Sequence, residues 1–541
     1  MKIILENIKK EIINTSATNN NDIYKSNLYW SQKPYNICDI LIKNFSDDGE
    51  VIFDPFMGSG VTIIQSLQKD INRKVIGVDI NEVPIFITKT LLKKYDYNIL
   101  HTEILRVIQR IEELNIFYRT NCNNCGGFGV VQKILFDRES IESEIKLKKV
   151  YYKCNCSKKT LEKEPDLEDI KNININYMIR NIDDIELLYN SRLAVYKGEK
   201  ISDIFTKRNF VVLDKIVEII NDENDVLADN LKYILLSILH LSKITDTHSN
   251  SQWPLWTPKT NCIEKNIIEL FKKRSKLFLK AIEYANKNLN ENRESVNSYS
   301  ELKNNSYLII KKGIQDISDE DVMDNGVDLV ITDPPYLGQV LYSEYMQLYK
   351  PFLNFSFNLE DEIVVSTAPY RTKKEDEYYK LMKSAFEKIG KKLKNGRYMC
   401  MYFHDSNLKV WSRLINLLSS SGFRYVSQVH IKKKNTLKNI ISPKKSLNGD
   451  CIVFFIKEEL IHEANTSVES IDEIEFNINK HIKGIIKLNG PLTTPELCDN
   501  GMLEFIIHNG WLHKLSEKYN SLVDIFEKEL KWDKEIGKWY L

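Results

Sequence analysis

Apolar residues follow two alternating patterns along this chain, short continuous runs and longer amphipathic stretches. Residues 51–53 and 74–80 are short apolar runs of the kind that forms buried parallel strands. After the first run come a glycine turn and then apolar residues with the spacing of a helix. Further strand-like runs cover residues 306–317, 327–336, 396–405, 423–431 and 450–459. Amphipathic helices are predicted between them at 374–394 and 407–420. Strands that alternate with helices predict an open α/β sheet.

Residues 95–300 interrupt this alternation, because their apolar positions have mainly helical periodicity. A chain of 541 residues is too long for one core. We therefore expect an α/β domain that a long, mainly helical insertion splits after its second strand. The expected parts are 1–95 and 305–459 for the α/β domain, 96–304 for the insertion, and 460–541 for a small helical C-terminal region.

Charge and composition exclude several classes of protein. The formal net charge is +1, so any surface for nucleic acid has to be a local basic patch. No apolar run is long enough for a membrane span, and the N-terminus lacks the apolar core of a signal peptide. Nine cysteines, scattered apart from one cluster, indicate a reducing compartment. We expect a cytoplasmic protein without a membrane partner.

The first candidate site is the glycine loop in "FDPFMGSGVT", between the run at 51–53 and the next helix. Gly58 and Gly60 allow close backbone approach to a ligand, and the helix start offers unpaired N–H groups. Asp79 ends the following strand, where a carboxylate can bind both hydroxyls of a ribose. A P-loop is excluded because no lysine precedes Thr62, and a dinucleotide fingerprint because Ile63 replaces its third glycine. The pattern predicts a nucleoside site, against the alternative of a tight strand–helix turn.

The second candidate site is Asp333-Pro334-Pro335-Tyr336, at the end of the run 327–336. An exocyclic amino group of a nucleobase is a poor nucleophile, because its lone pair is delocalised into the ring. Asp333 and the Pro334 carbonyl can accept its two hydrogens, Pro335 keeps the turn rigid, and Tyr336 can stack on a flipped base. The alternative is a proline turn that ends a strand. Phe403 and His404, near the end of the run 396–405, are expected to line this pocket.

Together, "DPFMGSG" and "DPPY" resemble the S-adenosylmethionine-dependent DNA amino-methyltransferases, which act on adenine N6 or cytosine N4. "WSQKPYNICDILIKNF" is similar to the family segment before the glycine loop, and the motif order is alpha-like, except that the insertion precedes the third strand. The resemblance covers roughly 28–95 and 305–458. It implies a Rossmann-like methyltransferase sheet and catalytic residues Asp333, Pro334, Pro335 and Tyr336. It implies that the cofactor is bound by Lys33, Pro34, Asp54, Phe56, Gly58, Gly60, Thr62, Asp79, Ile80 and Asp316.

The resemblance also implies direct transfer of a methyl group from S-adenosylmethionine to the amino nitrogen, without a catalytic metal. Double-stranded DNA with base flipping is the expected partner, and partner subunits of a restriction-modification or phage-defence system are a further expectation. Aspartate in the first motif position favours adenine N6. The alternatives are cytosine N4, an RNA or protein amide methyltransferase, and a silent DNA-binding subunit.

The one cysteine cluster lies in the insertion, as Cys122 and Cys125 in "CNNCGG" and Cys154 and Cys156 in "KCNC". Four thiolates suit a closed, tetrahedral and structural Zn²⁺ site, and the alternative is four free thiols. The C-x-C spacing of the second pair is tighter than usual. The cluster is similar to the zinc-ribbon of certain prokaryotic adenine-specific DNA methylases. We therefore expect the insertion to serve in target recognition, with basic runs at 271–280 and 431–445 as candidates for phosphate contacts.

Overall fold

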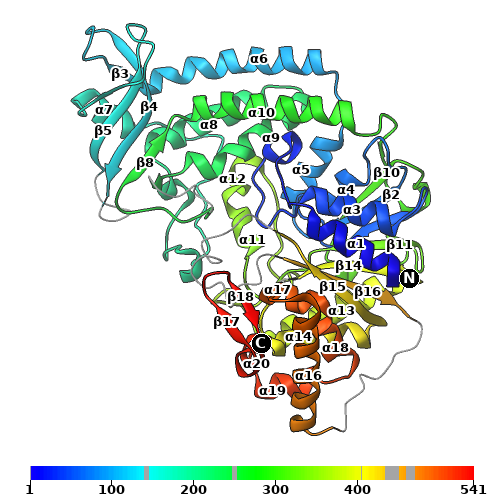
Figure 1. The fold of residues 1–541 in the computed structure, drawn as a ribbon. Coiled ribbons are helices and arrows are strands. Elements are labelled where there is room, and N and C mark those ends of the chain that lie inside the picture. The colour runs from blue at the N-terminus through cyan, green and yellow to red at the C-terminus, as the bar shows by residue number, and fades with distance from the viewer. Residues whose placement is uncertain (1, 139–144, 247–252, 404, 433–449, 459–468) are drawn as a thin grey trace.

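The computed structural model describes residues 2–138, 145–246, 253–403, 405–432, 450–458 and 469–541. Its centre is an eight-stranded sheet with helices on both faces, as Figure 1 shows. Within the described residues, no helix is long and apolar enough to cross a membrane. The large sheet with helices on both faces confirms the expected α/β class.

The strand order of this sheet is β15-β16-β14-β11-β1-β2-β10-β9. Its members are β1 (Val51–Asp54), β2 (Lys74–Asp79), β9 (Glu294–Ser295), β10 (Ser306–Lys311), β11 (Val327–Thr332), β14 (Leu393–Phe403), β15 (Phe423–His430) and β16 (Cys451–Lys457). All neighbouring strands pair in parallel except β16, which is antiparallel to both β14 and β15. After β2 and β10 the chain returns to the other side of β1 to form β11. The strand order reverses between β1 and β11, and in open α/β sheets ligands bind beside the carboxyl ends at such a point.

Both faces of the sheet are covered, which explains why its strands are continuous apolar runs. Consecutive side chains of a strand point to opposite faces. Ile52 and Phe53 are both 0 % exposed, and they belong to two different hydrophobic clusters. The cluster around Ile52 includes residues of α1 (Lys2–Asn14), α3 (Tyr35–Phe45), α4 (Val61–Gln65) and α5 (Glu82–Leu92). The cluster around Phe53 includes residues of α13 (Glu375–Lys392) and α14 (Leu408–Ser420).

Between α5 and β9 the described part of the chain forms five α-helices and a second sheet. The helices are α6 (Tyr97–Glu113), α7 (Leu167–Ile173), α8 (Lys207–Asn221), α9 (Asp225–Ser242) and α10 (Ile267–Asn288). The antiparallel second sheet has the order β6-β5-β4-β8-β7, with β3 paired to β4. Its strands are β3 (Arg119–Asn121), β4 (Phe128–Asp137), β5 (Lys146–Lys153), β6 (Leu161–Lys163), β7 (Thr245–Asp246) and β8 (Cys262–Lys265). Figure 1 shows β3, β4 and β5 at one end of α6, far from the C-terminal helices.

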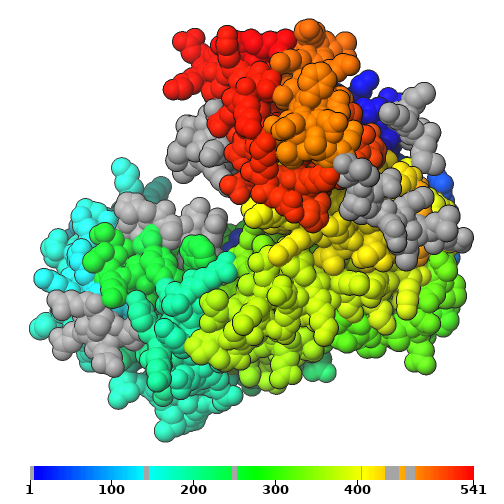
Figure 2. Space-filling view, turned by 90° about the horizontal axis from the view of Figure 1, so that it is seen from below, coloured from blue at the N-terminus to red at the C-terminus, as the bar shows by residue number. Residues whose placement is uncertain are grey.

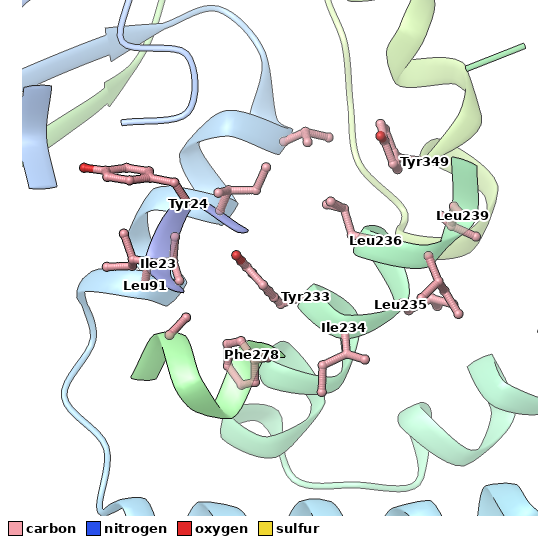
Figure 3. Packing of buried hydrophobic residues seen from close by; sticks show 14 of the residues in the cluster. Ile23, Tyr24, Leu91, Tyr233, Ile234, Leu235, Leu236, Leu239, Phe278 and Tyr349 are labelled. Carbon is pink, nitrogen blue, oxygen red and sulfur yellow. The ribbon is translucent and has the colours of Figure 1, made fainter. Parts of the chain in front are cut away.

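These helices share one core with the N-terminal part of the chain. Figure 3 shows Tyr233 of α9 and Phe278 of α10 beside Tyr24 of α2 (Asp22–Lys25) and Leu91 of α5. The ring centroids of Tyr233 and Phe278 lie 4.9 Å apart, and the buried hydroxyl groups of Tyr233 and Ser26 lie 2.6 Å apart. Burial of large side chains on both partners stabilises this junction, since each such side chain contributes about 1.5–3 kcal/mol.

The C-terminal region packs on β15 and α14. It contains α16 (Ile471–Asn489), α17 (Thr494–Leu497), α18 (Leu503–His508), α19 (Leu512–Lys518), α20 (Leu522–Glu529) and the hairpin β17 (Lys531–Asp533) and β18 (Lys538–Tyr540). His430 at the end of β15 contacts Asp499 through its backbone N–H, at 2.8 Å, and its ring Nδ1, at 2.6 Å. Figure 2 shows a recess between this region and the insertion.

Candidate active site

Two loops that begin with an acid and a proline lie side by side at the carboxyl ends of adjacent strands. Asp54 is the last residue of β1 and Asp333 directly follows β11. The pairs Ile52–Leu329 and Phe53–Val330 fix the register of the two strands. One cavity is lined by both loops, by Asp79 after the glycine loop, and by residues 29–33. The parallel sheet thus joins two motifs that are almost 280 residues apart.

The glycine loop has the backbone conformation that only glycine adopts easily. Gly60 precedes α4 with φ 74° and ψ 24°, and Gly58 has φ 47°. A Cβ atom on Gly60 would overlap the side chain of Thr88 in α5, and one on Gly58 would lie 3.2 Å from the ring of Tyr29. Close packing therefore requires glycine at position 60, and it leaves little room for a side chain at position 58.

Asp79 is fixed by the glycine loop and by the residue that follows its own strand. The Gly58 N–H donates to Asp79 Oδ2 at 3.0 Å, and the Asn81 N–H donates to Oδ1 at 2.9 Å. Burial nevertheless raises the pKa of Asp79 to about 7. A carboxylate has about four acceptor positions, so both oxygens retain capacity for hydroxyl groups of a ligand.

Asp54 adds a second acid to the same cavity. It is 5 % exposed and accepts from the Phe56 N–H at 3.2 Å. Burial raises its pKa to about 7 as well. Asp54, Asp79 and Asp333 make the cavity an environment that favours a positively charged ligand.

The Asp-Pro-Pro-Tyr turn is held by hydrogen bonds at both ends. The Tyr336 hydroxyl lies 2.7 Å from Asp333 Oδ1 and 2.5 Å from the carbonyl oxygen of Tyr402 in β14. The Tyr378 hydroxyl donates to the Pro335 carbonyl at 2.7 Å. Burial raises the pKa of Asp333, and the nearby Lys33 ammonium partly offsets this rise.

Lys33 lies directly beside the Asp-Pro-Pro-Tyr turn. Its Nζ is 2.9 Å from Asp333 Oδ2 and 3.2 Å from Asp450 Oδ2. Pro34 follows at the start of α3 with φ −63°, which suits a helix N-terminus. The predicted segment around Lys33 therefore closes the cavity on the side of Asp333.

Most of the residues predicted for the two sites line this cavity: Lys33, Asp54, Phe56, Gly58, Thr62, Asp79, Ile80, Asp333, Pro334, Pro335 and Tyr336. Pro34 and Gly60 do not line it, although each is next in the chain to a residue that does. Asp316 lines a neighbouring hollow, which shares Ile80 and Lys312 with the cavity. Phe403 packs against Tyr336 with ring centroids 5.8 Å apart, and His404 lies outside the described residues.

Several residues of the site were not found from the sequence. Asp450 contacts Lys33, and Tyr29, Tyr342 and Glu362 line the cavity. No short motif marks any of them. Thr332 was missed too, although its place directly before Asp333 was a signal. Thr332 Oγ1 and Gln315 Oε1, on residues that line the cavity, are buried and lack a hydrogen-bond partner within the described part of the chain.

The four cysteines of the insertion come together at one end of the second sheet. Cys122 and Cys125 lie between β3 and β4, and Cys154 and Cys156 lie between β5 and β6. All four sulfurs are within 4.8 Å of one another, and the pairs Cys122–Cys156 and Cys125–Cys154 are 3.6 Å apart. A tetrahedral site with Zn–S bonds near 2.3 Å has sulfur separations of about 3.8 Å. The donor set therefore fits one tetrahedral metal ion, despite the short C-x-C spacing.

The turn at Cys122 has the form that points two thiolates at one metal. The Gly126 N–H donates to the Cys122 carbonyl at 2.9 Å, and the Cys122 N–H donates to the Gly127 carbonyl at 2.8 Å. Gly126 has φ 69°, which glycine allows without strain. The C-x-x-C-G pattern therefore produces the expected local turn.

Of the two basic runs, 271–280 lies in α10, with Phe271 and Phe278 buried and the lysines Lys273, Lys276 and Lys280 exposed. In the second run, residues 433–445 lie outside the described residues.

Comparison with known proteins supports a relationship to DNA-modifying enzymes. Residues 6–89 match the family model N6_N4_Mtase, described as DNA methylase. Over 328 residues the chain is 24 % identical to the type II methyltransferase M.MjaII of Methanocaldococcus jannaschii, and the alignment covers 57 % of this chain and 58 % of that protein. The chain thus spans little more than half the length of this relative. No solved structure matches the chain significantly.

Proposed function

We propose that this chain transfers a methyl group from S-adenosylmethionine to adenine N6 in double-stranded DNA. The proposal starts from its relationship to the DNA methylases. The observation that carries the proposal is the single cavity that joins Asp79 and the glycine loop to Asp333 and Tyr336. The central sheet, with its order reversal between β1 and β11, would be the Rossmann-like sheet of such an enzyme.

The cofactor would occupy the end of the cavity formed by the glycine loop. Asp79 would bind the ribose hydroxyls, and Asp54 would favour the positive charge of the ligand. Phe56, Gly58, Thr62 and Ile80 would surround it, with Pro34 and Gly60 behind them and Asp316 in the adjoining hollow. Buried polar groups are normally hydrogen-bonded. Thr332 Oγ1 and Gln315 Oε1 have no partner within the described residues, which favours a ligand that bonds to them here. Bound S-adenosylmethionine would supply the methyl group, and the electrons of the broken carbon–sulfur bond would stay on sulfur.

The chain's own residues would prepare the target amino group at the other end. Asp333 and the Pro334 carbonyl accept hydrogen bonds from its two hydrogens, so that the lone pair is localised toward the methyl group. Tyr336 stacks on the base, and its hydroxyl fixes Asp333. The proton that the methylated nitrogen loses passes to Asp333 and then to water.

The remaining parts would bind and select DNA. We assign target recognition to residues 96–304, with Cys122, Cys125, Cys154 and Cys156 holding a structural Zn²⁺. The methyltransferase domain would comprise 1–95 and 305–459, followed by a C-terminal helical region at 460–541. A role in restriction-modification or phage defence, with partner subunits, is in keeping with the type II methyltransferase among its relatives.

Methylation of cytosine N4 is the second candidate, because the matching family model covers N6 and N4 enzymes together. The same cavity would serve both amino groups. The aspartate at the start of the motif favours adenine.

The test is transfer of a labelled methyl group to unmethylated double-stranded DNA, followed by nucleoside analysis. We expect N6-methyladenine. N4-methylcytosine in its place would overturn the choice of base, and absence of label on DNA would overturn the function. Asp333→Ala should abolish transfer and leave cofactor affinity within about threefold, since Asp333 acts at the target end. Asp472→Ala, on the first turn of α16, is the matched control and should retain full activity.

A further inference from the structure

A single lysine links the two acids nearest to the proposed target. Lys33 Nζ lies between Asp333 Oδ2, at 2.9 Å, and Asp450 Oδ2, at 3.2 Å. The side chains of Lys33, Asp333 and Asp450 are only 14 %, 19 % and 15 % exposed. The three residues come from distant parts of the chain, the start of α3, the end of β11 and the start of β16. Two carboxylates and one ammonium leave this corner of the cavity with a net charge of −1.

Aromatic rings complete the surroundings of the ammonium. Lys33 Nζ is 5.7 Å from the ring centroid of Tyr336 and 5.4 Å from that of Tyr402. These distances are within the range in which a cation is attracted by a ring face. Burial by itself lowers the pKa of Lys33, but the two acids more than compensate and raise it. Lys33 is therefore a fixed positive charge beside the Asp-Pro-Pro-Tyr turn.

The two oxygens of Asp333 have separate partners. Oδ1 contacts the Tyr336 hydroxyl at 2.7 Å, and Oδ2 contacts Lys33 at 2.9 Å. The carboxylate is thus fixed in orientation, and about two of its four acceptor positions remain for a ligand. An amino group can donate to an ionised carboxylate at either oxygen, whereas a protonated acid presents its own hydrogen at one of them.

We propose that Lys33 is a positioning residue for the target amino group: held by Asp450, its ammonium keeps Asp333 ionised and oriented to accept a hydrogen bond. This inference rests on the proposed function, and it assigns Lys33 to the target end of the cavity rather than to the cofactor. Asp450 acts through Lys33, because it provides the second negative charge that fixes the ammonium in this place.

The test measures two quantities in the wild type and in Lys33→Met, Lys33→Arg and Asp450→Asn. They are the single-turnover rate of methyl transfer over a range of pH, and the affinity for the cofactor. The rate should rise with pH as Asp333 ionises. Removal of a neighbouring positive charge raises a carboxyl pKa, so this rise should move to higher pH by about one to three pH units in Lys33→Met. At the pH of the wild-type midpoint, the rate should fall about fivefold or more, with cofactor affinity changed less than about threefold.

Two further variants separate charge from packing. Lys33→Arg keeps the positive charge and should restore the wild-type pH profile. Asp450→Asn removes a negative charge that raises the pKa of Asp333, so with Lys33 in place it should move the profile to lower pH, opposite to Lys33→Met. Lys43→Met, on the exposed side of α3 with its partners Asp39 and Asp70, is the matched control and should change neither quantity.

The outcomes distinguish this inference from the proposed function. An active wild type with an unshifted profile in Lys33→Met would overturn only the role of Lys33. Loss of cofactor affinity in parallel with activity, again without a shift, would return Lys33 to the cofactor end and overturn the inference. A wild type that transfers no methyl group to any nucleic acid would overturn the proposed function itself. Infrared titration of the carboxyl groups, with Asp333→Asn to assign the band, reports the Lys33–Asp333 contact independently of activity.

Discussion

The backbone N–H of Gly58 donates to Oδ2 of Asp79 at 3.0 Å, so the glycine loop and the acid after the next strand are held as one unit. The pairing of Asp54 with Gly77 in the adjacent strands fixes the distance between the two segments. A ligand that binds Asp79 therefore meets the glycine loop in a fixed position.

Asp79→Ala should weaken S-adenosylmethionine binding by about 10- to 100-fold, because a hydrogen bond to a charged group contributes about 1.5–3 kcal/mol. Isothermal titration calorimetry of the purified protein measures this. Asp70→Ala, which removes a largely exposed carboxylate, is the control and should bind as the wild type does. Unchanged affinity in Asp79→Ala would refute the ribose-binding role.

The stability of the ligand-free protein should fall as pH rises toward 7. Asp54 and Asp79 have pKa values of about 7 in the folded protein, raised by burial, and return to about 3.9 when unfolded. Between about pH 4 and 7 the folded state therefore binds more protons than the unfolded state, and the free energy of unfolding decreases with increasing pH. Urea denaturation at several pH values from 5 to 8 measures the slope.

Asp54→Asn provides the control for this pH dependence. It removes one of the two titrating groups, so the slope of stability against pH should become shallower. The same slope in the variant would show that Asp54 does not titrate in this window.

Gly60→Ala should destabilise the protein by about 1–3 kcal/mol, because alanine is strained at φ 74° and its Cβ overlaps Thr88. Chemical denaturation measures the loss. Gly537→Ala is the matched variant, since Gly537 has φ 65° but no neighbour within 4 Å of an added Cβ. It should cost less, and an equal cost at both positions would contradict the role of Thr88.

Wild-type protein should contain about one zinc ion per chain by elemental analysis. Cys125→Ser should lose it and unfold at a lower temperature, because zinc binding contributes to folding. Cys262→Ala removes a buried cysteine of β8 outside the cluster and should retain the metal. Full zinc content in Cys125→Ser would contradict the four-thiolate site.

The expectations that the structure bears out rest on residues close together in the sequence. A strand, two glycines and a helix start specify the loop at 58–60, because its positive φ angles are a local requirement. The turn after Cys122 forms for the same reason. Continuous apolar runs indicated strands buried on both faces, and Ile52 and Phe53 do contact different cores.

The sequence by itself determined the two motifs, the two cysteine pairs and the alternation of strands and helices, because each depends on local spacing and on the chemistry of a few adjacent residues. Only the tertiary structure decided which distant residues meet. Lys33 and Asp450 are 417 positions apart, and Asp316 lies in an adjoining hollow rather than in the cavity. An apolar run indicates a strand but not which strands lie next to it. The folded sheet shows that β1 lies beside β11 and β14 beside β16. The acid partner of Lys33 was therefore set by the pairing of strands, which no local pattern encodes.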